Sequence, residues 1–211
     1  MTVGEQSRRP IPCDNSLEVI ASLTASLSSV IDKTCVLQRL WGVVHLDKSK
    51  ISIMIDTTLP VLLQLRLSSP EVNYWLAAVL EEFTAFSSFV IHTQPTKVAF
   101  LNMLVKLLKV PDPANAFLDS KCTAANSVAN LIQVSGEQAA HTIVVDSAGL
   151  VGHLCALLHV KRECAQHSSL RALWRLAYYS PTIRDEVSSH LASVCVITIN
   201  KDIVQIRHHS H

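Results

Sequence analysis

Glycine, charge and strand-like patterns are all scarce in this chain. Only five of its 211 residues are glycine and only 17% are charged, whereas 49% are hydrophobic. Intrinsic disorder requires low hydrophobicity and high charge, so this composition excludes a disordered chain. Strict alternation of apolar and polar residues, which marks a half-buried β-strand, is nearly absent. The composition therefore favours a well-buried all-α protein.

A large excess of either charge is lacking as well. The formal net charge is +1, so no sequence-wide field favours nucleic acid, and no nucleic acid is expected as a partner. Arg66 or the pair Glu81 and Glu82 interrupts the longest apolar runs before about 18 residues have passed. Asp14 and Glu18 break the N-terminal apolar run, which therefore does not fit a secretory signal. We expect a cytoplasmic and/or nuclear protein without a membrane span.

Motifs for catalysis and cofactor binding are missing too. Gly136, Gly149 and Gly152 fall at expected helix turns, and none is followed by the Lys-Ser/Thr of a phosphate-binding loop. Neither G-x-S-x-G nor H-E-x-x-H occurs. Because no acid, base or nucleophile is assembled, we predict that the protein is not an enzyme and uses no cofactor.

Cysteine and histidine raise the question of a metal site. Two of each type fall within 13 residues in the spacing C-x3-H-x4-C-x2-H: Cys155, His159, Cys164 and His167. Structural zinc sites use C-x2-4-C and H-x3-5-H pairs, which this spacing does not match, so no metal site is predicted. We interpret all six cysteines as reduced, buried, small hydrophobic residues: Cys13, Cys35, Cys122, Cys155, Cys164 and Cys195.

Helical periodicity is what the chain does contain. Apolar residues recur at i, i+3, i+4 and i+7 through most of its length, and prolines fall between these segments. Pro70 follows two serines and Pro181 follows Ser180, so that a hydroxyl can cap the helix that each proline begins. This punctuation predicts many helices of about 10 to 15 residues.

A short helix leading into a longer one is an order that recurs along the chain. The expected helices that lead into the longer ones are Leu59–Leu67, Phe100–Leu108 and Leu150–Leu158. Short first helices of the repeats are expected near Ser49–Ile55 and Phe86–His92. The spacing of the longer helices is uneven, so insertions are expected in loops around 109–118 and 132–141.

The three tryptophans occupy equivalent places in the longer helices. They lie in CVLQRLWGVVHL, VNYWLAAVLEEF and SLRALWRLAYY, and a fourth stretch, TAANSVANLIQV, has Asn126 in that place. Self-similarity of this kind is the sequence signature of a helical repeat.

The stretches 124–158 and 169–187 resemble consecutive armadillo repeats, with an A-G turn, paired leucines and a long third helix. The resemblance implies a right-handed α-solenoid of about four armadillo-like repeats over 16–206, after a flexible leader (1–15) and before a tail (207–211). Repeats of the HEAT type are the nearest alternative. Each unit alone cannot bury its apolar faces, and stacking makes a continuous core.

In armadillo proteins the third helices line a concave groove that binds extended peptides. The importin-alpha type pairs a Trp with an Asn four residues later. In this chain the positions four residues after Trp41, Trp75, Asn126 and Trp174 hold His45, Val79, Asn130 and Tyr178. No repeat holds the complete pair. The contacts predicted from the resemblance are Trp41, His45, Trp75, Asn126, Asn130, Arg171, Trp174 and Tyr178. Packing between repeats is an equally simple role for each tryptophan.

The expected function is that of a non-catalytic scaffold or adaptor that binds a protein or an extended peptide along this groove. One alternative is importin-alpha-like recognition of basic peptides in nuclear transport. Another is a structural subunit, or a truncated isoform of a longer solenoid. The apolar segment Leu191–Ile199 lacks the polar face of a terminal repeat, so assembly through the C-terminal end is also considered.

Overall fold

Regular secondary structure in this protein is helical throughout the described part of the chain. The computed structural model describes residues 17–29, 32–86, 94–146 and 149–189, and no strand occurs within these ranges, which confirms the all-α class. The helices are α2 (Leu17–Ser29), α3 (Thr34–Leu46), the 3-10 turn η1 (Lys48–Lys50), α4 (Ile51–Thr57), α5 (Leu59–Leu62), α6 (Pro70–Ala85), α7 (Gln94–Lys109), α8 (Leu118–Asp146), α9 (Leu150–Leu158), α10 (Glu163–Tyr179) and a last helical stretch over 181–189.

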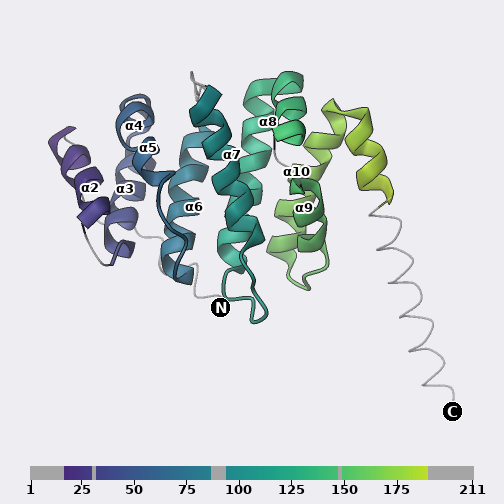
Figure 1. Cartoon of the computed structure of the whole chain (residues 1–211), viewed down its shortest axis with the longest axis horizontal. Helices are drawn as coiled ribbons and strands as arrows, with labels where there is room; N and C mark the ends of the chain where they lie inside the picture. Colours follow the sequence, from purple (N-terminus) through teal and green to yellow (C-terminus); the bar gives the residue numbers. More distant parts are fainter. Residues whose placement is uncertain (1–16, 30–31, 87–93, 147–148, 190–211) are drawn as a thin grey trace, which may run out of the picture.

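The helices lie side by side in sequence order, from α2 at one end to α10 near the other (Figure 1). Helices α3, α6, α8 and α10 pack against one another in that order and form one layer. The second layer covers them, with α2 on α3, α7 on α8 and α9 on α10. Contacts therefore join neighbours along the row, and this packing is compatible with a helical repeat.

The apolar core runs between the two layers. Helix α6 shows why one unit would not be stable without its neighbours. The five consecutive residues from Leu76 to Leu80 are all buried, and five residues cover more than one full turn of the helix. A helix at the surface buries only one stripe. Burial on all sides requires neighbours on both flanks, which α3 and α8 provide.

Side-chain caps begin two helices where the sequence predicts them. The Ser69 hydroxyl accepts a hydrogen bond from the Val72 N–H at 3.3 Å, directly before Pro70. The Ser180 hydroxyl accepts from the Ile183 N–H at 3.4 Å. Both pairs satisfy an amide that has no partner within its helix, so the predicted Ser-Pro starts are confirmed here.

The predicted helix Leu59–Leu67 is wrong in its second half. Helix α5 ends at Leu62, and the chain passes through a turn at 63–64 into a non-helical segment over 65–69. The fully buried Asn73 holds this segment in place, because its Oδ1 accepts a hydrogen bond from the Ser68 N–H at 3.0 Å. Leu65 and Leu67 still pack against the core, so the segment buries its leucines without helical geometry.

The predicted loop at 132–141 is also wrong. Helix α8 is 29 residues long and passes through this range and through Gly136 without a break. A glycine inside a helix costs only about 0.5–1 kcal/mol relative to alanine, which the alanines and glutamate beside it can offset. The other predicted loop is observed as the non-helical segment 110–117. The helix expected near Phe86–His92 falls largely outside the described residues, as do both termini and the segment 191–199.

Two glycines at the start of α9 allow a matched test of the backbone. Gly149 has a φ of +86°, a conformation that disfavours a side chain, whereas a Cβ added at Gly152 would meet no atom within 4 Å. Gly152→Ala is therefore expected to raise the free energy of unfolding by about 0.5–1 kcal/mol. Gly149→Ala is expected to lower it by about 1 kcal/mol. Urea unfolding followed by circular dichroism measures both, and equal effects would contradict the assigned start of α9.

Within the described ranges, no helix has both the length and the apolar character needed to cross a bilayer.

Candidate partner-binding surface

Two of the three tryptophans fill the contact between α3 and α6. The residue Trp41 is 6% exposed and Trp75 is 4% exposed. Their ring centroids lie 5.5 Å apart, and the Tyr74 ring meets Trp75 edge-on at 5.1 Å. The expectation of three open tryptophan faces on one groove needs correcting, because these two indoles are used in helix packing.

His45 lies at the solvent edge of the same contact. Its ring stacks on Trp41 with centroids 4.6 Å apart, and its Nδ1 lies 2.8 Å from Glu82 Oε1. The Lys48 ammonium contacts the second carboxylate oxygen of Glu82. His45 is therefore the predicted contact in this region that stays exposed. It is paired with Glu82, whose charge Lys48 already balances.

Helices α8 and α10 are joined by two arginines. Arg171 Nη2 donates a hydrogen bond to Asn130 Oδ1 at 2.9 Å, and Arg175 Nη1 donates to the Ala129 carbonyl oxygen at 2.6 Å. Burial, followed by the charge of Arg171, lowers the pKa of Arg175. Asn126 lies one helical turn before Asn130 and is partly buried. The predicted residues Asn130 and Arg171 thus contact each other directly, and each guanidinium keeps further N–H groups beyond these bonds.

Beside these arginines lies an open aromatic pair. Trp174 is 65% exposed and Tyr178 is 66% exposed, and their ring centroids are 6.0 Å apart. Both lie on the side of α10 opposite its buried residues Ala165, Ala172 and Leu176. We call Arg171, Trp174, Arg175 and Tyr178 the α10 surface.

The sequence reasoning missed two members of this neighbourhood. Leu170 is 47% exposed and lies four residues before Trp174, which extends the apolar stripe by one turn. Arg175 was not among the predicted contacts, although it follows Arg171 by four residues and so shares its face of the helix. The i, i+4 spacing of both pairs is the signal that would have found them.

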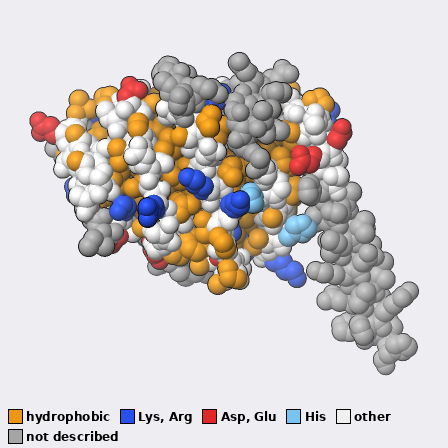
Figure 2. Space-filling model, viewed as in Figure 1, with side chains coloured by type: hydrophobic (Ala, Val, Ile, Leu, Met, Phe, Trp, Pro, Cys, Tyr) orange, Lys and Arg blue, Asp and Glu red, His pale blue; other side chains and the backbone are white. Residues whose placement is uncertain are grey.

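The opposite layer presents a different surface. In the common view of Figures 1 and 2, α7 and α9 lie in front, and apolar side chains are scattered over this face among polar and basic ones. Acidic side chains lie mainly toward the edges of this view (Figure 2). None of the predicted groove residues belongs to α7 or α9.

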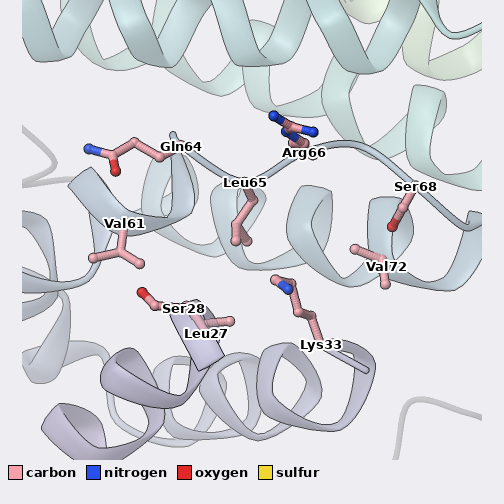
Figure 3. A pocket seen from close by; sticks show the side chains of 9 residues that line it. All are labelled: Leu27, Ser28, Lys33, Val61, Gln64, Leu65, Arg66, Ser68 and Val72. Atoms are coloured by element: carbon pink, nitrogen blue, oxygen red, sulfur yellow. The ribbon is translucent and has the colours of Figure 1, made fainter. Parts of the chain in front are cut away.

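A pocket of about 400 Å³ opens where α5 ends early. Its apolar wall includes Val61, Leu65 and Val72, and the Lys33 side chain reaches toward Leu65 from the start of α3 (Figure 3). Arg66 lies on the other side of the non-helical segment from Leu65 (Figure 3). The pocket lies beside the turn and the non-helical segment over 63–69 that replace the predicted helix, and none of the predicted contacts lines it.

The cysteines depart from their predicted burial. Cys122 and Cys155 are buried, but Cys35 and Cys164 are exposed. The Cys164 sulfur lies 3.9 Å from that of Cys122 in α8. No group of three or more metal-ligating side chains comes together among the described residues, so Cys155, His159, Cys164 and His167 do not meet there as a cluster.

Over the described ranges, the geometry defines an all-α protein with two packed layers of helices and an open aromatic–arginine face. Comparison with protein-family models, curated proteins and solved structures gave no match.

Proposed function

We propose that the chain is a right-handed, armadillo-like array of about four repeats that binds a partner protein without catalysis. The third helices of its units would be α3, α6, α8 and α10. The order in which these four helices pack supports this, because the equivalent helices of stacked repeats lie side by side.

The α10 surface carries the proposal. Trp174 and Tyr178 together expose two large rings, which soluble proteins seldom leave open side by side without a use. Tryptophan, tyrosine and arginine are also the side chains that contribute most to binding at protein interfaces. The bonds of Arg171 and Arg175 to α8 hold the guanidinium groups beside the rings before any partner arrives, which lowers the entropic cost of binding.

An acidic, extended segment is the partner that this chemistry suits best. Two arginines lie beside the two aromatic residues along α10, and guanidinium pairs with carboxylates in bidentate geometry. A basic peptide would meet like charge at the same place, and Glu82 at the other end of the layer is already paired with His45 and Lys48. These contacts favour an acidic partner over importin-alpha-like recognition of basic peptides.

A charge-swapped pair of peptides tests the proposal. One labelled peptide is rich in Glu with interspersed Leu, and its twin has Lys in place of every Glu. We expect the acidic peptide to bind and the basic twin not to, as measured by fluorescence anisotropy at low ionic strength, with affinity falling as salt screens the arginines. Trp174→Ala is expected to weaken binding by about tenfold or more.

The matched control is Leu46→Ala, because Leu46 is 53% exposed on α3, far from the α10 surface. It should leave the affinity unchanged. Stronger binding of the basic twin would favour the nuclear-import alternative. Failure of both peptides, together with self-association that Trp174→Ala abolishes in light scattering, would replace the proposal with a structural role in assembly.

A further inference from the structure

Two cysteines from different helices lie in contact at the α8–α10 junction. Cys122 belongs to the first turns of α8 and Cys164 to the first turn of α10, and they are 42 residues apart in the chain. Their sulfur atoms are 3.9 Å apart. A disulfide bond needs about 2.05 Å, so the sulfurs would have to approach by about 1.9 Å.

The two thiols differ sharply in access to solvent. Cys164 is exposed, whereas Cys122 is 7% exposed. Burial, and next the neighbouring Cys164, raise the pKa of Cys122 far above the ordinary range of a thiol. An oxidant in solution therefore meets Cys164 first, and Cys122 lies behind it as a thiol. An exposed cysteine next to a second, resolving cysteine is the arrangement of redox-sensitive sites.

We propose that Cys122 and Cys164 form a reversible disulfide when the protein meets a peroxide. The Cys164 thiol gives up its proton to solvent, the thiolate attacks one oxygen of hydrogen peroxide, and the O–O bond breaks. A sulfenic acid results, and the departing hydroxide takes up a proton to become water. The Cys122 sulfur then attacks the Cys164 sulfur, the S–O bond breaks, and the Cys122 proton leaves with the hydroxyl as water. In total, two thiols and one peroxide give one disulfide and two waters, with two electrons passed to the peroxide.

The bond would tie the start of α8 to the start of α10. In a reducing compartment the pair stays as two thiols, and the disulfide forms only while oxidant is present. A cross-link over 42 residues lowers the conformational entropy of the unfolded chain. The oxidised protein should therefore melt about 5 °C higher than the reduced one. This inference does not depend on the proposed function.

The test uses the full chain treated with hydrogen peroxide. We expect the intact mass to fall by two hydrogen atoms, and we expect proteolysis without reductant to release a linked peptide containing Cys122 and Cys164. Dithiothreitol should restore the mass and reverse the rise in melting temperature. The linked peptide should be absent from Cys164→Ser and from Cys122→Ser.

The matched control is Cys35→Ser, which removes the exposed cysteine of α3 and should leave the linked peptide in place. Should Cys122→Ser fail to fold, the peptide map of the unaltered chain still decides. The proposal is overturned if peroxide leaves Cys122 reduced while Cys164 gains two or three oxygen atoms or links to a second chain.

Discussion

Trp75→Ala is expected to lower the free energy of unfolding by about 3–5 kcal/mol, whereas Trp174→Ala is expected to lower it by no more than about 1 kcal/mol. The sequence places the two tryptophans in equivalent positions, but Trp75 is 4% exposed and Trp174 is 65% exposed. Removing the Trp75 indole leaves a cavity against Trp41 and Tyr74. Removing the Trp174 indole takes away a side chain that mostly contacts water.

Urea unfolding followed by far-ultraviolet circular dichroism measures both effects, because the signal does not depend on the tryptophan removed. Trp75→Phe keeps most of the ring volume and should lose clearly less stability than Trp75→Ala. If Trp174→Ala unfolded the protein as readily as Trp75→Ala, the exposed position of Trp174 would be wrong, and the α10 surface could not serve as an open binding face.

The class of the fold and much of its order follow from the sequence. Helix α9 begins and ends at the predicted residues, Leu150 and Leu158, because paired leucines set its buried face and Gly149 precedes it. The longer helices that contain Trp41, Trp75, Asn126 and Trp174 are all present and share one layer. Periodicity identifies these elements because it depends on each helix's own residues.

Whether each tryptophan is buried or exposed could not be predicted from periodicity in the same way. Whether an indole is buried depends on which helix packs against it, and that helix can be far away in the sequence. Trp41 meets Trp75 across 34 residues, whereas Trp174 has no helix over its ring among the described residues. Pairings between helices, such as Arg171 with Asn130, likewise leave no trace in local periodicity.

The early end of α5 has a similar origin. Leu59–Leu67 has a helical pattern of leucines, but the buried Asn73 on the following helix binds the Ser68 N–H and favours the non-helical form. Such a side-chain bond to the backbone competes with the helix and depends on tertiary position. In α8 the effect is the opposite, since local residues suggested a turn and the helix continues.

The continuity of α8 gives the second large expected effect. Gln138→Pro should lower the free energy of unfolding by about 3 kcal/mol or more, because proline removes a backbone N–H from the helix and its ring clashes with the carbonyl four residues earlier. Gln138 lies within α8, well before the helix ends at Asp146. In the loop that the sequence predicts at 132–141, the same substitution would be tolerated.

Gln138→Ala separates the backbone from the side chain in this test. It removes the same side chain but keeps the N–H and favours helix, so it should leave stability unchanged or slightly higher. A large loss for proline and none for alanine, measured by urea unfolding, therefore locates a helix at this position. Equal, small effects of both substitutions would restore the predicted loop, and α8 would then be two shorter helices.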